Sequence, residues 1–583
     1  MNKFISDGID VNRGKKLKKY WVLGKKVFQC SALSIAFIFV LQIINNSIYP
    51  LGAILLKKMV VQVNEMDSKI YVSIILLVFI YILQLIFGGF INILMDKTQL
   101  NISCSLYEEL FYNIHSKALT ELDKSTFLQK IKYSREAIDS EIRELIFSIS
   151  SLIGEFVGVI ITAASIFYVD KFILGLFIVS CVMQNVFTGK STNENIKLIK
   201  EKEPIERKIL YIDNLLSNKN SIKECRIYKS ESWLLEKRKK YFSEKKKMSL
   251  KYSSKWTIIN IVWSILMYIL EFCVLKYLFE VYRRGALTLD DFIFIVESQA
   301  IFVVKFGSLI KQINNFKIKN LYISSYIDIC FSKENEQDEN NKEIVEDRRK
   351  VLELKNISFA YGEKKVIENL SFSIGLGEKI AIFGENGSGK STLVKLLLGL
   401  LTPDKGEICY CNSEIGVIFQ DFGKYSFSVK ENISLNREFS DKDIFEALFS
   451  FGGNNILTGL PNSIYTNIGV EYYNDGVDFS GGQWQKLALA RGMIGENMLY
   501  ILDEPFSALD ALAEKVQYDL LFSNYRFESF VIVSHQMGLA NMVDKVILLE
   551  NGKIIAYGVH NELMKNCKKY RQMYETQSKY YEN

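Results

Sequence analysis

Long apolar runs alternate with polar, lysine-rich stretches over the first half of the chain. The runs that approach or exceed the length of a membrane span cover residues 27–56, 70–94, 145–168, 172–187, 257–279 and 292–309. A helix needs roughly 20 residues to cross the hydrocarbon core of a bilayer, so we expect the shorter fourth run to continue as a longer helix. The pattern therefore predicts six membrane-spanning helices.

The connections between these runs alternate between short and long. Residues 57–69, 169–171 and 281–291 form short connections, whereas residues 95–143 and 188–256 are long and polar, with helical periodicity and Pro204 as their one proline. Two independent soluble insertions would show strand or turn signals, and these segments show few. We therefore expect the helices to continue well beyond the bilayer.

The first 26 residues are strongly basic, with eight Lys or Arg against two Asp. An excess of Lys and Arg marks the cytoplasmic side of a membrane. A secretory signal is the alternative, but residues 27–56 are far longer than its apolar region and lack a small-residue cleavage site. We expect both chain ends inside, and a kink where Asn45, Asn46 and Pro50 interrupt the first span.

The second half of the chain has the pattern of a soluble α/β domain. Residues 351–361 alternate between apolar and polar positions, residues 366–374 form a second predicted strand, and residues 498–502 and 530–534 form short apolar strands. Residues 331–349 are charged and rich in amides, which is typical of a solvated linker. The predicted domains are a basic terminus (1–26), a membrane domain (27–330), the linker (331–349) and the α/β domain (350–583).

Composition excludes some classes of function. A net charge of +6 is small for 583 residues and does not indicate nucleic-acid binding. The nine Cys form no C-x-x-C pair, and Cys409 and Cys411 alone would make a poor metal site. Only three His are present, so a His-based metal site is not expected.

A phosphate-binding motif follows the predicted strand that ends at Phe383. It fits G-x-x-x-x-G-K-[ST] and comprises Gly384, Glu385, Asn386, Gly387, Ser388, Gly389, Lys390, Ser391 and Thr392. Glycines let backbone N–H groups approach phosphates, and the start of the following helix adds positive potential. A glycine-rich turn with a chance lysine is the alternative, but the motifs further along the chain favour a nucleoside triphosphate site.

Three further motifs follow in a fixed order. Ser480-Gly481-Gly482-Gln483 comes after Phe479, the pair Asp503-Glu504 ends an apolar strand, and His535 ends another. Together with Gln420 after residues 415–419, they resemble the cassette of an ATP-binding cassette (ABC) transporter of the exporter type. A lone Gln, Tyr or His is more often structural, but the complete set in this order indicates function.

The resemblance implies a role for each residue. Gln420, Ser391 and Asp503 would hold Mg²⁺, Glu504 would polarise the attacking water, and His535 would contact the γ-phosphate. Tyr361 lies where the family stacks an aromatic ring on adenine, and Asp510 resembles the loop that crosses the dimer seam. Phe479 to Gln483 would cap the γ-phosphate of the opposite subunit.

Some local sequences differ from the family pattern, and others follow it. Phe479 replaces a usual Leu, an exchange of apolar residues, and Asn474 stands where many exporters have a Glu. Leu122-Asp123 and residues 223–226 lie where such exporters carry short coupling helices. The fold class implied is an all-α six-helix transmembrane domain followed by an α/β P-loop NTPase domain.

Several ionisable residues lie inside the predicted spans. Glu155, Glu271 and Glu297 are candidates for lining the substrate path, because charges in lipid usually face a bundle interior or a cavity. Mutual pairing, or snorkelling of the side chains to the membrane surface, is the alternative. Carboxylates along the path would favour a substrate with cationic groups.

The resemblance implies an ATP- and Mg²⁺-dependent half-transporter of the cytoplasmic membrane, which acts as a dimer in contact with membrane lipids. Intact Glu504 and His535 favour a homodimer, with a heterodimer still open. Its substrate would be a peptide or natural product; lipid flipping, multidrug efflux and an ATP-gated regulatory role stay open. The basic terminus is too short for a leader-peptidase domain, and the six spans argue against a soluble nucleic-acid-associated ATPase.

Overall fold

A computed structural model describes the chain except residues 1, 170, 332–342, 345–348, 411–413, 507–510, 526 and 582–583. It describes no side chains at residues 2–17, 49, 169, 177, 180, 181, 184, 185, 343, 344, 454, 511–513 and 579–581. The chain divides into two compact units, Met1–Ser116 with Lys124–Glu334 and Lys117–Asp123 with Asn335–Asn583. Most of the predicted linker lies outside the described residues.

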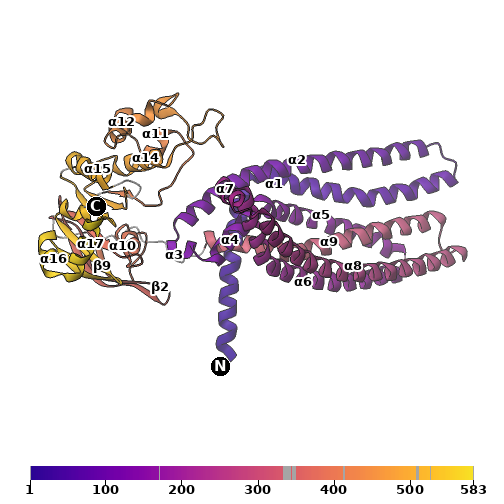
Figure 1. Cartoon of the computed structure of the whole chain (residues 1–583). Helices are drawn as coiled ribbons and strands as arrows, with labels where there is room; N and C mark the ends of the chain where they lie inside the picture. Colours follow the sequence, from indigo (N-terminus) through magenta and orange to yellow (C-terminus); the bar gives the residue numbers. More distant parts are fainter. Residues whose placement is uncertain are drawn as a thin grey trace. The chain divides into compact units, whose positions relative to one another are not determined.

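The N-terminal part of the chain is helical throughout its described length (Figure 1). Its elements are α1 (Asn2–Asn64), α2 (Ile70–His115), α3 (Leu119–Leu122), α4 (Ser125–Glu136), the π-helical turn η1 (Ala137–Glu141), α5 (Ile142–Val169), α6 (Lys171–Ser217), α7 (Lys219–Ile227), α8 (Glu231–Arg283) and α9 (Leu289–Cys330). In the part of the chain that the structure describes, five helical stretches are long and apolar enough to cross a membrane: Lys18–Asn64, Ile70–His115, Ser125–Tyr168, Glu231–Arg283 and Leu289–Cys330. The predicted fourth span, residues 172–187, lies on α6, and several of its side chains lie outside the described residues.

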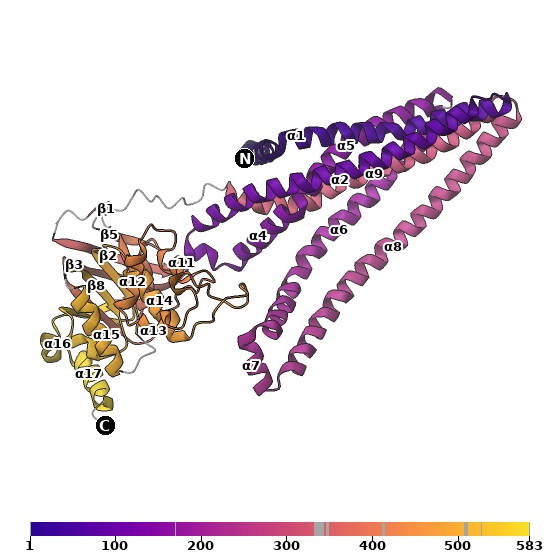
Figure 2. The ribbon, with the colours of Figure 1, turned by 90° about the horizontal axis from the view of Figure 1, so that it is seen from above.

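The helices continue well past the predicted spans, as the polar connections indicated. The helix α2 reaches His115, α6 reaches Ser217 and α8 begins at Glu231. The helices α6 and α8 form a pair that is joined at one end by the short α7 (Figure 2). The short helices α3 and α7 contain or adjoin the two sites where coupling helices were predicted.

The first helix breaks at a different position from the one predicted. Ser31 has non-helical backbone angles (φ −153°, ψ 42°), and its hydroxyl accepts a hydrogen bond from Asn101 of α2 at 3.3 Å. Pro50 stands inside the continuing helix. Proline cannot donate to the carbonyl of Asn46, and that carbonyl lies so close to α5 that a Cβ on Gly158 would be 3.3 Å from it. The helices α1 and α5 thus pack closely at the carbonyl that Pro50 leaves without its usual helical hydrogen bond.

The C-terminal part of the chain is an α/β domain. Its strands are β1 (Glu343–Ile344), β2 (Lys350–Tyr361), β3 (Lys364–Gly375), β4 (Lys379–Gly384), β5 (Lys405–Tyr410), β6 (Ile415–Ile418), β7 (Leu499–Asp503), β8 (Ser529–Val533), β9 (Lys545–Glu550) and β10 (Lys553–Gly558). Its helices are α10 (Lys390–Leu397), α11 (Val429–Ser434), α12 (Asp441–Phe449), α13 (Asn454–Leu457), η3 (Ser463–Tyr465), α14 (Gly481–Met493), α15 (Ala511–Asn524), η4 (Met537–Asn541), α16 (His560–Asn566) and α17 (Lys568–Tyr581).

Two sheets form the centre of this domain. One has the strand order β1-β5-β2-β3, and the other has the order β10-β9-β4-β8-β7-β6 and is parallel except for β10. Side chains on the larger sheet alternate between two cores. Ile380 and Ile382 of β4 face the core shared with α10, whereas Ala381 and Phe383 face the core shared with α14 and α15.

The parallel register brings four strand ends to one edge of the larger sheet. Ile382 of β4 pairs with Val533 of β8, and Val533 pairs with Asp503 of β7. Leu502 pairs with Ile418 of β6. In parallel α/β sheets, ligands bind outside the carboxyl ends of the strands. The phosphate loop and the segments that carry Asp503, His535 and Gln420 therefore share the edge where a ligand would bind.

Candidate functional site

The loop between β4 and α10 requires glycine at several positions. Gly387 and Gly389 have φ angles of +82° and +106°, in the left-handed region that side chains disfavour. A Cβ on Gly384 would lie 2.4 Å from the Leu549 carbonyl oxygen and 2.6 Å from the Ser388 hydroxyl. Close contacts thus require glycine at position 384, and the backbone angles favour glycine at positions 387 and 389.

Lys390 is buried, and its ammonium group points back into the loop. Its Nζ donates to the carbonyl oxygens of Gly384 at 2.7 Å and Glu385 at 3.1 Å. Burial lowers the pKa of Lys390, and the nearby carboxylates of Glu504 and Asp503 oppose that shift. The Ser388 hydroxyl is buried and has no hydrogen-bond partner among the described residues. A buried cation beside an orphaned hydroxyl fits a phosphate group.

The carboxylates Asp503 and Glu504 lie at the end of β7 in different surroundings. Asp503 is 7% exposed. Burial, and then the charge of Glu504, raise its pKa to about 6, while Lys390 lowers it. Glu504 has a φ of +48°, a strained angle for this residue type. Its backbone N–H donates to the Val533 carbonyl at 3.0 Å, which holds the turn in place.

Both carboxylate oxygens of Glu504 have partners from neighbouring strands. Gln420 Nε2 donates to one oxygen at 2.8 Å, and His535 Nε2 lies 2.7 Å from the other. The side chain of Glu504 is 12% exposed and that of His535 44%, so the imidazole faces solvent. A carboxylate held between an amide and an imidazole can orient a water molecule and accept its proton. The structure thus brings these three predicted residues together.

The signature segment forms the start of α14. Ser480 caps the helix, because its hydroxyl accepts from Gln483 N at 3.4 Å and its own N–H donates to Gln483 Oε1 at 2.8 Å. Gly481 and Gly482 are exposed, and a Cβ on either would meet nothing within 4 Å. Phe479 packs edge-on against Trp484 with ring centroids 5.8 Å apart. The result is an accessible helix N-terminus, which favours an anion.

The remaining predicted residues surround the loop or lie outside the described part. Glu385, Asn386 and Ser391 are exposed, and Thr392 is half-buried. Tyr361 ends β2, is 38% exposed and packs edge-on against Phe359. The next strand reaches the phosphate loop, since a Cβ on Gly389 would lie 3.0 Å from the Ile367 side chain. Asp510 lies outside the described residues.

Sequence reasoning missed Arg491, which joins α14 to the segment after Gln420. Its guanidinium donates to the Asn432 backbone carbonyl at 2.6 Å, to the Gly423 carbonyl at 2.9 Å and to the Asn432 side chain at 3.1 Å. It also lies 4.8 Å from the ring of Tyr425. Burial lowers its pKa. The available signal was its position directly after the apolar residues 487–490, because a charged side chain next to a buried helix face needs hydrogen-bond acceptors.

The candidate substrate-path carboxylates lie in the helical unit formed by Met1–Ser116 and Lys124–Glu334, which we call the membrane unit. They differ in their surroundings. Glu155 is buried and accepts from the Ser308 hydroxyl at 2.6 Å. Nearby, Lys305 donates to Asn46 Oδ1 at 2.5 Å, and Asn46 donates to the Gln42 carbonyl at 3.0 Å. This polar cluster joins α1, α5 and α9. The other two candidates, at positions 271 and 297, are half-buried.

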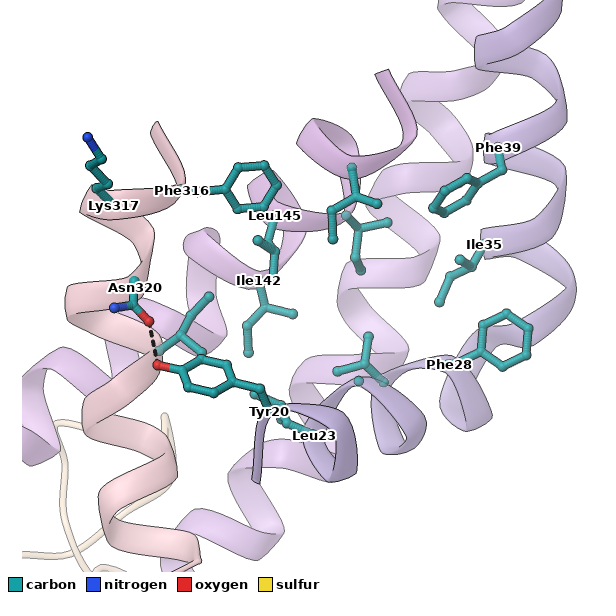
Figure 3. Close-up of a pocket in the computed structure, with 15 residues that line it drawn as sticks. Tyr20, Leu23, Phe28, Ile35, Phe39, Ile142, Leu145, Phe316, Lys317 and Asn320 are labelled. Carbon is teal, nitrogen blue, oxygen red and sulfur yellow. Dashed lines mark hydrogen bonds between the residues drawn. The ribbon is translucent and has the colours of Figure 1, made fainter. Parts of the chain in front are cut away.

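A cavity of about 640 Å³ lies elsewhere in the membrane unit, between α1, α5 and α9. Its lining is mainly apolar and includes Phe28, Phe39 and Phe316, while the Tyr20 hydroxyl donates to Asn320 at its rim (Figure 3). Lys317 points away from the apolar side chains in this view. The lining includes none of the three candidate carboxylates.

Comparison with known proteins agrees with this geometry. The family model for ABC transporters matches residues 367–507. The subtilin transport ATP-binding protein SpaT of Bacillus subtilis is 28% identical, and the aligned region covers 83% of this chain and 81% of SpaT. The nisin transport ATP-binding protein NisT of Lactococcus lactis subsp. lactis is 24% identical and covers 94% of each chain.

A solved structure shows the same fold over most of the chain. It is that of a bacterial Atm1-family ABC exporter with ATP bound, with a TM-score of 0.79, 19% identity, and coverage of 94% of this chain and 98% of the other. The predicted fold class, a helical membrane domain followed by an α/β cassette, is confirmed. The chain therefore carries an ABC transporter cassette at residues 367–507 and resembles ABC exporters over most of its length; it is a multi-pass membrane protein whose cassette binds ATP and couples its hydrolysis to transport.

Proposed function

We propose that two copies of this chain form an exporter that moves a peptide or peptide-derived natural product out of the cytoplasm. The observation that carries the proposal is similarity to subtilin and nisin transport proteins over most of the chain, the membrane unit included. The membrane unit is where a transporter meets its substrate. Similarity confined to the cassette would support ATP hydrolysis and say nothing of the substrate.

The phosphate loop would bind the triphosphate through backbone N–H groups, the Ser388 hydroxyl and Lys390. Lys390 would exchange its two carbonyl partners for phosphate oxygens. The Ser391 hydroxyl, Asp503 and Gln420 would hold Mg²⁺, which commonly takes one or two carboxylates together with substrate phosphates. When bound, the ion would neutralise phosphate charge. Tyr361 would stack on the adenine ring.

Hydrolysis would depend on Glu504 as the residue that orients and deprotonates the attacking water. Gln420 and His535 hold its two oxygens in the structure. A bound γ-phosphate would then compete for the imidazole, and that competition would free one oxygen of Glu504 to face the water. The strained backbone at Glu504 supports this role, since strained residues cluster at active sites.

The exposed signature would complete the site of a second subunit. Gly481 and Gly482 leave the start of α14 open to an anion. We propose that Phe479 to Gln483 cap the γ-phosphate held by the partner's loop, with Asp510 at the seam. The complete set of catalytic residues supports a homodimer, because both composite sites would then be competent.

Closure of the cassettes on ATP would drive the membrane units from an inward-open to an outward-open state, because ATP binds the closed state preferentially. The basic N-terminus supports a cytoplasmic location for both termini and the cassette. The apolar cavity also suits an amphipathic compound or lipid, which keeps lipid flipping or drug efflux as the second candidate.

The test is ATP-dependent uptake into inside-out proteoliposomes of the full-length protein, with Glu504→Gln as the inactive control. A labelled amphipathic peptide, a fluorescent phospholipid and a hydrophobic dye are offered in parallel. We expect the peptide to accumulate with the native protein alone. Accumulation of lipid or dye but not of peptide would establish the second candidate, and no accumulation of any would contradict export.

A further inference from the structure

The segment that carries His535 has few constraints from its own strand. The strand β8 ends at Val533, and the short helix η4 begins at Met537. A cavity of about 420 Å³ lies beside this segment and is lined by Gln536 and Leu539, among others. A segment with open space on one side can shift unless something holds it. Contacts from another part of the cassette must therefore fix the orientation of the His535 imidazole toward Glu504.

The C-terminal helix α17 packs one face on the cassette core. That face consists of four residues at helical spacing: Tyr570, Met573, Tyr574 and Gln577. Tyr570 is fully buried and shares a hydrogen bond of 2.7 Å with His560. The Tyr574 hydroxyl accepts from Asn541 Nδ2 of η4 at 2.7 Å. The helix is thus anchored in the core over about two turns before Gln577.

Gln577 bonds to the backbone on both sides of Gln536. Its Oε1 accepts from the Met537 N–H at 2.7 Å, and its Nε2 donates to the His535 carbonyl at 2.7 Å. One planar amide therefore satisfies a donor and an acceptor two residues apart. A second bond supports the same turn, since Gln536 N donates to the Ser534 hydroxyl at 3.0 Å.

We propose that Gln577 is a positioning residue for ATP hydrolysis, which fixes the backbone at His535 and thereby keeps the imidazole against Glu504. The inference rests on the proposed function, because it assumes that His535 supports hydrolysis. Gln577 lies on a helix outside every motif of the nucleotide site. Its effect would pass through two backbone bonds and not through contact with the nucleotide.

The test compares Gln577→Met with Gln572→Met in the full-length protein reconstituted in nanodiscs. Methionine keeps the length and the packing of glutamine but removes both hydrogen bonds, and Gln572 is an exposed position of the same helix. We expect Gln577→Met to lower kcat on the order of tenfold to a hundredfold, as a small misplacement of a catalytic group does. The KM for ATP and the melting temperature should stay within error of the Gln572→Met control.

A second measurement separates positioning from a general structural role. In a His535→Ala background, Gln577→Met should change kcat by less than twofold, because its effect passes through the missing imidazole. An equal loss in that background, or native kcat in Gln577→Met while His535→Ala is impaired, would overturn the inference. If His535→Ala itself hydrolyses ATP at the native rate, the proposed function of His535 fails instead. Amide hydrogen exchange at residues 535–541 should then still be faster in Gln577→Met than in the native protein. That result would show that Gln577 holds this backbone segment in place but has no role in catalysis.

Discussion

The two units of the chain both bury ionisable side chains, but they satisfy them differently. In the cassette, Lys390 and Asp503 are buried beside an orphaned hydroxyl at Ser388, at a sheet edge open to ligand. In the membrane unit, the buried Lys305 and Glu155 each bond to a polar side chain on another helix. The first set is arranged for a ligand, whereas the second serves largely to join helices.

This difference shows where the chemistry of the molecule is concentrated. Burying a charge costs free energy unless a partner compensates. In the cassette, ATP would supply the missing partner. In the membrane unit, side chains on neighbouring helices offset part of that cost, although Glu155 Oε2 has no hydrogen-bond partner among the described residues. The apolar lining of the 640 Å³ cavity is consistent with a membrane unit that recognises its substrate mainly by apolar contacts. Substitutions in each unit should reveal this difference, and their effects are expected to differ widely in magnitude.

Lys390→Met should have the largest effect, because it removes the buried cation proposed to bind the phosphates. We expect ATP affinity to fall by at least about a hundredfold, since a buried charge-assisted contact is worth several kcal/mol. The matched control is Lys395→Met, an exposed lysine of the same helix. Fluorescent ATP titration checks the result. Native affinity in Lys390→Met would mean that the loop is not the binding site.

Lys305→Met should reduce stability but leave ATP affinity unchanged. Removing one member of a buried polar cluster typically costs about 3–5 kcal/mol, because its partners stay buried without compensation. We expect a lower melting temperature, partly restored by adding Glu155→Gln, and native values for Lys311→Met, an exposed control on α9. Unchanged melting with lost transport would instead assign Lys305 to the substrate path.

Glu514→Gln should stabilise the cassette at high pH. Glu514 is buried, and burial raises its pKa to about 7, above its value in an unfolded chain. The folded state therefore binds more protons, so stability is greatest below about pH 4 and is lost as pH rises through 7. Melting curves should show a gain of a few degrees for Glu514→Gln at pH 8 and almost none at pH 4.5. A gain independent of pH would contradict this cause.

Lowering the pH should raise the apparent KM for Mg²⁺ in ATP hydrolysis, and this is the smallest of the expected effects. With a pKa of about 6, Asp503 loses most of its carboxylate form as the pH falls below that value. Between pH 7 and pH 5.5 the ionised fraction falls about fourfold, and the apparent KM for Mg²⁺ should rise by a similar factor. Hydrolysis assays at several Mg²⁺ concentrations check this result. A flat profile would indicate that Asp503 does not hold the ion.

Residue positions could be predicted from the sequence where the local backbone or strand geometry accepts one kind of residue. Glycines at Gly387 and Gly389 meet left-handed angles, and an apolar strand delivers Asp503 to the sheet edge, so spacing alone indicated both. It could not place the break in α1, because Ser31 carries no local signal comparable with Pro50. It also missed Arg491 and Gln577, whose partners are distant or backbone atoms that no motif encodes.

We propose that each ATP is held by the phosphate loop of one chain and the signature of another. Lys390→Met and Ser480→Arg, prepared separately, should each lose ATP hydrolysis. Co-expressed as a purified mixed dimer, they would contain one intact composite site, and we expect hydrolysis to return to roughly half the native rate. No recovery in the mixed dimer, or native activity in Ser480→Arg alone, would contradict the claim.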